Sequence, residues 1–459
     1  MSAPQKILIV GAGYTGLTAA LRLSAEKRFS ITVTEAARDL GGLAGGFQIQ
    51  GTSLEKTYHH LFLTDTAILD LVKELGLQEK LMWCESSVGI FRDGKSHPFK
   101  TPGDLLRFSP CNFSGRLRTG FAALYLKHQK NWRGFARQTA HAWMTRACGR
   151  SAMDTIWTPL LKGKFDRHFD RISMAWFWAR IHIRANSRSG GGGEKLGYFR
   201  GGFNVITEAL EQKLRERGVV IRTGAPVEKF LADERAAVIH GEKVGFDFCI
   251  FTGPSPALAK LLPAGTTFDA YTAQLRSVEY LGAICLIFTS AQSLGDFYWL
   301  NVNAPDAPFL VFIQHTNLVD KSFYGGKQVY YIGAYLDAEG SRFSLADPEL
   351  TKLWFDYLKK MYPAFEAGKV EEKFIFRLRN AQHIVDTDYE PRIPSYQTPL
   401  PGVFLANFSQ VFPEDRGTNF AVREGEKIAA LVRQAAGQSR AEPWRDCLQS
   451  GPGDDVIGG

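Results

Sequence analysis

The 459-residue sequence has no apolar run of the roughly 18 residues that a bilayer-spanning helix needs, so we expect no transmembrane segment. Cysteine is scarce: six are scattered along the chain, with no C-x-x-C pair and no metal-ligand spacing. The first residues lead into an apolar strand rather than a signal peptide. These absences predict a cytoplasmic protein with reduced thiols and no bound metal.

The sequence also lacks the residue patterns of several enzyme classes. We find no Ser-His-Asp arrangement, no paired-carboxylate site, no internal repeat and no nucleic-acid recognition module. At this length, with 45% hydrophobic residues, the chain is too long for one compact core, and two or three lobes are expected.

Acidic residues are nearly absent between Lys95 and Arg150, where eleven Lys and Arg face a single acid, Asp104. The net charge of the whole chain is +8, so this segment carries more than the entire excess. It also contains apolar residues at near-helical spacing, which predicts a basic amphipathic helix; Leu117, Phe121, Leu124 and Trp132 approximate one face.

Three interpretations of this segment stay open. The helix could lie on an anionic membrane, with Phe121, Tyr125, Trp132 and Phe135 at the headgroup boundary. It could instead bind an anionic or lipid-linked substrate. The ordinary alternative is a helix that packs its apolar face internally and exposes its basic residues to water.

The first motif with chemical content lies near the N-terminus, where an apolar strand over 7–10 is followed by a glycine-rich turn and a helix. Gly11 permits the turn, Gly13 lets the backbone approach a pyrophosphate, and Gly16 lets the helix pack closely on the strand. The first helical residues, Tyr14 and Thr15, present their backbone N–H groups to the phosphates.

A second strand, over 31–34, ends at an acidic residue about 20 positions beyond the last of these glycines, as in dinucleotide-binding folds. Its carboxylate is expected to accept hydrogen bonds from ribose hydroxyls. The cofactor-binding residues predicted here are Glu35 and Ala36.

A second glycine-rich turn follows at once, over 38–46. It resembles the extended flavin fingerprint of the amine oxidase, protoporphyrinogen oxidase and phytoene desaturase superfamily. That resemblance implies FAD as the cofactor, with its pyrophosphate wrapped by an arginine and a Gly-Gly pair. The residues that correspond are Arg38, Gly41, Gly42, Leu43 and Ala44.

Segments in the middle and at the end of the chain resemble the same superfamily. The run over 198–210 is similar to its mid-chain Gly-Gly turn and helix, and Val227 to the valine whose backbone holds the adenine. A last strand over 402–407 leads to a helix that, in the family, points its N-terminus at the flavin pyrimidine ring. The usual glycine-acid pair is Ala406-Asn407 here. The cofactor contacts implied are Asn407, Gly417, Thr418, Asn419 and Phe420.

His59 and His60 are the candidate catalytic residues, since they follow the flavin segment where this fold turns toward the isoalloxazine ring. A near-neutral imidazole there could exchange protons with flavin N5 or with substrate. Packing for shape alone is the alternative. Other polar residues are expected to be structural partners: Arg200, Arg377, Arg379, Asn380, Gln382 and His383.

The predicted fold class is α/β: an FAD-binding Rossmann-like domain of the two-dinucleotide-binding type, a mixed-sheet substrate domain and a helical insertion. The FAD-binding domain is assigned residues 1–95, 195–260 and 385–440. The basic helical insertion covers 100–190 and the substrate domain 260–385. A disordered tail is expected over 441–459.

The resemblance implies an FAD-dependent oxidoreductase that transfers a hydride between a small organic substrate and flavin N5. One alternative is a flavin-dependent isomerase resembling UDP-galactopyranose mutase, without net redox change. Another is a flavin-binding protein that has lost catalysis. Neither the substrate nor the oligomeric state is readable from the sequence.

Overall fold

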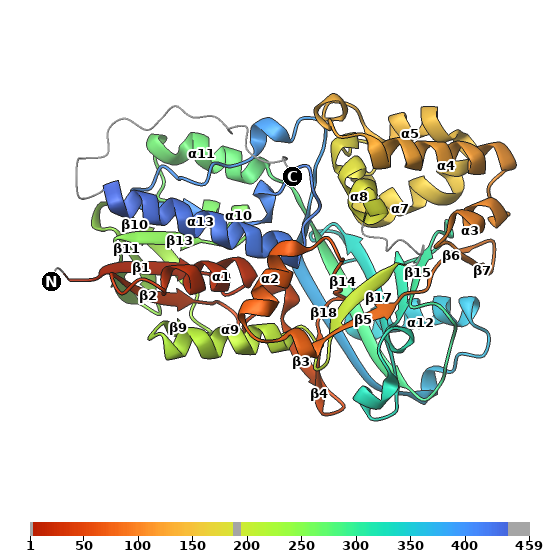
Figure 1. Cartoon of the computed structure of the whole chain (residues 1–459), viewed down its shortest axis with the longest axis horizontal. Coiled ribbons are helices and arrows are strands. Elements are labelled where there is room, and N and C mark those ends of the chain that lie inside the picture. Colours follow the sequence, from red (N-terminus) through yellow and green to blue (C-terminus); the bar gives the residue numbers. More distant parts are fainter. Residues whose placement is uncertain (1–2, 187–193, 439–459) are drawn as a thin grey trace.

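The computed structural model describes residues 3–186 and 194–438. Figure 1 shows three regions: a parallel sheet with its helices on the left, a helical region at the upper right, and a second large sheet below that region. This mixed arrangement confirms the predicted α/β class. The predicted tail over 441–459 lies outside the described residues.

The nucleotide-binding region is built on a five-stranded parallel sheet of order β19-β13-β1-β2-β9. Its central strand, β1, is apolar on both faces over its last four residues, which suits a strand covered on both sides. The strands are β1 (Gln5–Val10), β2 (Phe29–Thr34), β9 (Val220–Arg222), β13 (Phe248–Phe251) and β19 (Val403–Leu405). The chain therefore returns to this sheet from widely separated segments.

Helices and small sheets surround this region. The helices are α1 (Tyr14–Leu23), α2 (Thr66–Glu74), α9 (Asn204–Glu216), α10 (Ser255–Leu261), α11 (Thr266–Ser277) and α13 (Thr418–Gln438). A three-stranded sheet joins β10 (Val227–Leu231), β11 (Ala236–Ile239) and β12 (Glu242–Gly245). Two strand pairs join β3 (Gly46–Ile49) to β4 (Thr52–Glu55) and β5 (Leu81–Glu85) to β8 (Lys195–Phe199).

The second large sheet has seven strands in the order β18-β14-β17-β16-β15-β6-β7. They are β6 (Val88–Arg92), β7 (Lys95–Pro98), β14 (Tyr280–Ser290), β15 (Trp299–Val302), β16 (Val311–Gln314), β17 (Gln328–Leu336) and β18 (Val370–His383). Helix α12 (Asp347–Met361) buries Leu350, Trp354 and Leu358 in the core that it shares with this sheet.

One predicted boundary is wrong. Because β6 pairs with β15 in parallel, residues 88–98 belong to the seven-stranded sheet. The sequence assignment had placed everything up to residue 95 in the FAD-binding domain. A short strand pair carries no local mark of the sheet that it joins.

The helical region packs around a core rich in tryptophan, phenylalanine and methionine, to which Ile90, Leu281 and Val385 from outside the region also contribute. It contains α3 (Pro102–Arg107), α4 (Phe113–His128), α5 (Ala140–Cys148), α6 (Arg150–Ala152), α7 (Thr158–Phe165) and α8 (Met174–Asn186). Within the described ranges, no helix combines the length and apolar character needed to cross a membrane.

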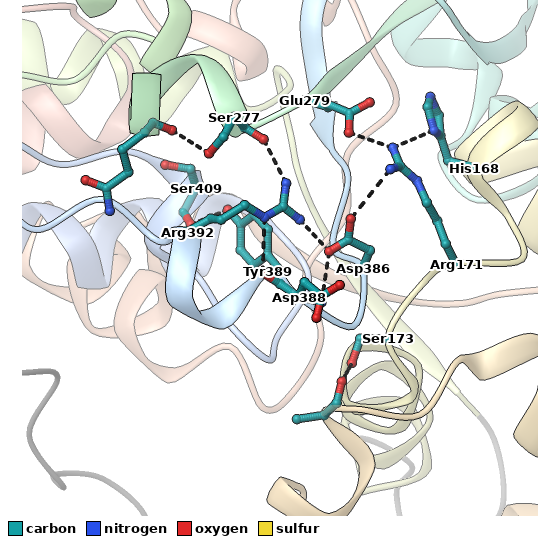
Figure 2. A network of polar contacts seen from close by, with 12 residues as sticks. His168, Arg171, Ser173, Ser277, Glu279, Asp386, Asp388, Tyr389, Arg392 and Ser409 are labelled. Carbon is teal, nitrogen blue, oxygen red and sulfur yellow. Dashed lines mark hydrogen bonds and ion pairs between the residues drawn. The ribbon is translucent and has the colours of Figure 1, made fainter. Parts of the chain in front are cut away.

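An ion-pair network fixes the helical region to the rest of the molecule (Figure 2). Arg171 contacts Glu279 at 2.7 Å and Asp386 at 3.7 Å, both in segments adjoining the seven-stranded sheet. Arg392 reaches the other carboxylate oxygen of Asp386 and donates to the Ser277 carbonyl at 2.8 Å. Since Asp386 is nearly buried between two arginines, this contact holds the helical region in a defined position.

Candidate functional site

The turn between β1 and α1 has the geometry expected of a pyrophosphate cradle. Gly11 has a φ of +108°, which side-chain-bearing residues rarely adopt. A Cβ on Gly16 would lie 2.0 Å from the Gly11 carbonyl oxygen, so only glycine allows this close approach. A Cβ on Gly13 would instead have only the Gly42 Cα, at 3.8 Å, within contact range. Open space therefore lies beside Gly13, at the start of α1.

The second glycine-rich turn lies directly against the first. Gly13 and Gly41 form a parallel bridge, and the Gly41 N–H donates to the Ala12 carbonyl at 2.9 Å. Gly41 and Gly42 both have positive φ, and a Cβ on Gly42 would lie 3.1 Å from the Gly13 Cα. The two turns thus place glycine backbone, without side chains, side by side at the start of α1.

Glu35, the residue predicted to bind the ribose, supports the first turn. Its carboxylate accepts hydrogen bonds from the N–H groups of Ala12 and Ala37, each at 2.8 Å. A carboxylate has further lone pairs, so it can still accept from a ribose hydroxyl. The Ala225 N–H donates to the Glu35 carbonyl at 2.8 Å, which brings the segment leading to Val227 beside the same residue.

The side chains of several predicted contact residues point elsewhere. Tyr14 is buried and donates to the Phe203 carbonyl at 3.0 Å, so its backbone alone can meet a phosphate. Arg38 and Ala36 are exposed on the loop after β2. Asn407 is buried and caps the turn at 408–410, accepting from the Ser409 N–H at 2.9 Å.

The last helix begins where the sequence predicts, at Thr418. A Cβ on Gly425 would lie 2.6 Å from the Thr15 carbonyl, so α13 packs closely on α1. Asn419 accepts from the Ile68 N–H at 3.2 Å, while Gly417 is exposed and Phe420 half-buried. The start of α13 therefore lies beside α1 and α2.

These features fit a dinucleotide. Helix α1 starts without a side-chain cap or an acidic residue in its first turn, so its backbone N–H groups and partial positive charge are available to an anion. Gly13, Gly42 and the α1 N-terminus would hold the pyrophosphate, and Glu35 the ribose. The individual cofactor contacts stay predictions.

Short contacts lead from the glycine turns to the candidate histidines. The Thr57 hydroxyl donates to the Leu43 carbonyl at 3.2 Å, and Nδ1 of His59 lies 2.8 Å from the Thr57 carbonyl. His60 packs edge-on against Phe62 and Trp299, with Nδ1 3.3 Å from the Tyr298 hydroxyl. Both histidines therefore lie beyond the second turn, where the sequence places them.

The near-neutral imidazole expected from the sequence is not found. Burial lowers the pKa of His59 to about 4 and that of His60 to about 3. Both side chains are neutral at pH 7 and would be weak bases. This favours packing or hydrogen bonding over proton transfer, although the catalytic role itself stays a prediction.

A cluster of charged residues that the sequence did not single out lies where the three regions meet. It consists of Lys164 on α7, Arg180 on α8, and Asp415 and Arg416 just before α13. Asp415 accepts from Lys164 at 2.7 Å and from Arg180 at 2.6 Å. The Trp176 indole donates to its other oxygen at 3.2 Å. We call these four charged residues the cation cluster.

Two tyrosines connect the cation cluster to the histidine segment. Arg416 donates to the Tyr335 hydroxyl at 2.8 Å and to Gln382 Oε1 at 3.2 Å. Tyr335 in turn interacts with Tyr58, the residue before His59. The cation cluster therefore adjoins the segment that leads away from the flavin turns.

Electrostatics in the cation cluster favour negative charge. Although burial opposes ionisation, Lys164, Arg180 and Arg416 hold the pKa of Asp415 well below its usual value. Burial likewise disfavours ionisation of Tyr335, but Arg416 and Lys164 bring its pKa below the ordinary value. Burial lowers the pKa of Lys164, an effect that Asp415 opposes. Three cations thus share one carboxylate.

A family model described as flavin-containing amine oxidoreductase matches residues 14–425. The chain belongs to this family. Its cofactor is accordingly FAD.

Two curated relatives are similar in sequence. Coproporphyrinogen III oxidase of Staphylococcus aureus (strain NCTC 8325 / PS 47) is 21% identical over 304 residues, covering 58% of this chain and 64% of the relative. The zeta-carotene-forming phytoene desaturase of Myxococcus xanthus is 25% identical over 303 residues, covering 57% and 56%. The chain thus spans less than two thirds of the length of these relatives.

Solved structures are similar over nearly the whole chain. A protein provisionally named protoporphyrinogen oxidase, from Exiguobacterium sp. 255-15, is 20% identical with a TM-score of 0.75, covering 95% of this chain and all of that one. Reduced UDP-galactopyranose mutase is 16% identical with a TM-score of 0.73, covering 95% of each chain. At such identities these likenesses show the fold alone.

A further buried acid of this flavoenzyme escaped the sequence analysis. Glu55, at the end of β4, is fully buried and accepts from the Tyr198 hydroxyl at 2.8 Å and the Phe203 N–H at 2.5 Å. Burial raises its pKa to about 7, despite these hydrogen bonds. It joins the hairpin after the flavin turn to the Gly201-Gly202 turn, and nothing in its local sequence signals burial.

Two of the weaker candidates form the ion pairs that the sequence predicts for them. Arg377 pairs with Asp347 at 2.5 Å and donates to the Leu345 carbonyl, and Arg379 pairs with Glu339. Gln382, by contrast, contacts the cation cluster through Arg416.

Proposed function

We propose that this flavin-containing oxidoreductase oxidises an anionic organic substrate bound at the cation cluster. FAD would supply the redox chemistry by accepting a hydride from the substrate at flavin N5. The observation that carries the proposal is the excess of three cations over one carboxylate beside the histidine segment.

The arrangement of these cations supports an anionic ligand. Lys164 and Asp415 are both nearly buried, where an excess of like charge is costly unless a counter-charge is present. The hydrogen bonds of Arg416 to Tyr335 and Gln382 go to neutral groups. Arg416 also precedes the positive end of α13, which opposes a cation and favours an anion.

Different residues would have different roles in binding the substrate. Lys164 and Arg180 come from the helical region and would orient the anionic group through charge-assisted hydrogen bonds. Arg416 fixes the Tyr335 hydroxyl and, with it, the neighbouring Tyr58. The aromatic rings around His60 would exclude water from the reacting carbon.

Anaerobic mixing with a panel of organic acids, amines and uncharged analogues tests the proposal, with flavin bleaching followed at about 450 nm, the absorbance band of oxidised flavin. Arg180→Gln is the informative variant, because Asp415 keeps Lys164 as its partner. For an anionic substrate we expect KM to rise about tenfold, the loss of one charge-assisted hydrogen bond. FAD content should not change.

Arg377→Gln is the matched control, since it removes a part-buried arginine whose ion pair lies outside the cluster. It should leave KM unchanged. Faster bleaching by uncharged analogues, or an unaltered KM in Arg180→Gln, would contradict an anionic substrate.

A flavin-dependent isomerase is the second candidate, favoured by the structural similarity to UDP-galactopyranose mutase. The cation cluster would then hold a diphosphate. The two functions separate on redox state: an isomerase needs reduced flavin and consumes no oxidant, whereas an oxidoreductase bleaches oxidised flavin with each substrate turnover.

A further inference from the structure

Large apolar side chains gather on one exposed surface of the helical region. Among the described residues, nine large hydrophobic residues are exposed, and six of these lie within twenty positions on α3 and α4, between 38% and 70% exposed. We call them the exposed apolar face: Leu106, Phe113, Leu117, Phe121, Leu124 and Tyr125. Single exposed apolar residues are ordinary, but a contiguous group marks a contact surface.

The face follows from the way α4 is turned. Its exposed residues recur every three or four positions from Phe113 to Tyr125, so they share one side of the helix. The opposite side, which is buried, carries mainly small residues: Gly115, Thr119, Ala122 and Leu126. A Cβ on Gly115 would lie 2.8 Å from Cys111 Sγ, so this side packs too closely for larger residues. The helix buries its small side and exposes its large one.

Leu106 belongs to the same surface. Its carbonyl accepts from Arg116 Nη1 at 2.5 Å, which ties the end of α3 to α4. Figure 1 shows both helices at the outer edge of the molecule. The two helices that carry the face therefore lie far from the nucleotide-binding sheet.

Charge around the face is almost wholly positive. Arg107, Arg118, Lys130 and Arg133 are exposed on or beside the two helices. The one acid between Lys95 and Arg150, Asp104, is engaged in the capping box of α3 and lies 4.0 Å from Arg107. Apolar residues bordered by cations complement a surface with a hydrocarbon interior and anionic headgroups.

We propose that the exposed apolar face of α3 and α4 docks on an anionic lipid bilayer. Helix α4 has 16 residues and one apolar side, so it would lie in the plane of the interface. Phe113, Phe121 and Leu124 enter the headgroup boundary, and the arginines and lysines contact the lipid phosphates. The contact is peripheral and weakens as salt screens the charges.

The membrane contact does not depend on the proposed function, but it has a consequence for substrate access. On its inner side α4 packs against α8, where Nε1 of Trp178 donates to the Gln129 carbonyl at 2.9 Å. Helix α8 also carries Arg180 of the cation cluster. A docked bilayer thus lies one helix layer from α8, which would bring a lipid-linked anionic substrate near that cluster.

Vesicle co-sedimentation of the FAD-bound protein tests the docking. Phosphatidylcholine vesicles are compared with vesicles that also contain phosphatidylglycerol, at low and high salt. We expect wild type to bind the anionic vesicles about tenfold more strongly than the neutral ones at low salt, and this preference to fall at high salt.

Variants then locate the contact. Phe121→Ser with Leu124→Ser should lower binding to the anionic vesicles about tenfold, because two exposed side chains lose their apolar burial. Arg107→Gln with Lys130→Gln should lower binding to anionic vesicles alone. Leu353→Ser, at another exposed leucine, on α12, is the control and should bind as wild type. All variants keep the flavin site, so FAD content verifies folding.

Equal binding by wild type and the Phe121→Ser, Leu124→Ser variant would overturn the proposal, as would equal binding to both kinds of vesicle. Sedimentation velocity tests the alternative that the exposed apolar face binds a second copy of this chain. If wild type self-associates, that variant is monomeric and neither binds vesicles, the face is a self-association surface and the membrane proposal is wrong.

Discussion

A pair of glycine substitutions separates cofactor binding from folding at the β1–α1 turn. Gly13 has φ −74° and ψ 176°, ordinary extended values that any residue adopts, and its absent Cβ would face open space. Gly16 lacks such freedom, because its Cβ would lie 2.0 Å from the backbone oxygen of Gly11. Gly13→Val should therefore lose FAD while the protein still folds, whereas Gly16→Val should disturb the fold itself.

The magnitudes follow from these distances. At Gly16 two backbone segments must separate by more than 1 Å, judged against the roughly 3.4 Å of an ordinary contact, and overpacking of this kind costs about 1–3 kcal/mol or more. In a protein stable by about 5–15 kcal/mol this is a large fraction. At Gly13 the cost to the apoprotein should be within about 0.5 kcal/mol, as for a surface substitution. The branched side chain then occupies the space proposed for the pyrophosphate.

Two measurements on each variant decide the matter. The ratio of flavin to protein absorbance after incubation with excess FAD gives occupancy, and thermal melts of the apoproteins by circular dichroism give stability. We expect Gly13→Val to be colourless with the apoprotein Tm of wild type. Full FAD occupancy in Gly13→Val would refute the assignment of the phosphate site. Loss of apoprotein stability equal to that of Gly16→Val would refute the distinction between the two glycines.

Three further substitutions test other parts of the site. Glu35→Ala should weaken FAD binding by about 1.5–3 kcal/mol, the worth of a charge-assisted hydrogen bond, and an unchanged Kd by titration would argue against the ribose contact. Burial raises the pKa of Glu55 to about 7 from 4.5, so the folded protein favours the protonated carboxyl. This preference contributes about 3 kcal/mol to the free energy of unfolding below pH 4.5, and the contribution is lost as the pH rises through 7. Glu55→Gln should therefore gain stability relative to wild type between these pH values in paired denaturant melts; a constant difference would contradict the raised pKa. His60→Ala should slow flavin reduction in rapid mixing more than it weakens FAD binding, with no inflection near pH 6.5 in the wild-type rate attributable to this residue. Equal reduction rates would leave His60 a packing residue.

The nucleotide half of the site could be predicted because its determinants are local in sequence. A strand, three glycines and a helix start fall within a dozen residues. Gly11 and Gly16 have a steric reason visible in the structure, whereas Gly13 borders the open space proposed for the pyrophosphate. The determinants of the second glycine turn and of the start of the last helix are likewise local in sequence. Side-chain contacts could not be predicted in the same way, because the side chains of Tyr14 and Asn407 both form hydrogen bonds within the protein.

The cation cluster could not be predicted, because no local pattern brings it together. Lys164, Arg180 and Asp415 come from two helices and a loop more than 200 residues further along the chain, and they meet only when the helical region packs on the two sheets. The same holds for the pKa of His60, since the burial that lowers it comes from Phe62 and from residues near position 298. Sequence gives the chemistry of a side chain, whereas tertiary packing gives its environment.

Helix α4 shows a case in which the sequence pattern was identified but its orientation was not. The spacing of Leu117, Phe121 and Leu124 predicts an apolar face, and the ordinary expectation is that this face packs inward. The structure contradicts that expectation for these three residues. Trp132 was wrongly included, because α4 ends at His128 and Trp132 packs edge-on against Phe412.

The orientation of α4 follows from its small residues rather than its large ones. Thr119, Ala122 and Gly115 allow the helix to approach α5 and α8 closely, as a side bearing Phe113 and Phe121 could not. Each large apolar side chain left in water forgoes about 1.5–3 kcal/mol of burial free energy. Phe135, just beyond the helix, shows that this region can bury an aromatic ring where it has room. A helix that exposes its bulky residues while packing its small ones, within a nearly acid-free segment, is therefore best explained by a second environment outside the protein that accepts the bulky residues.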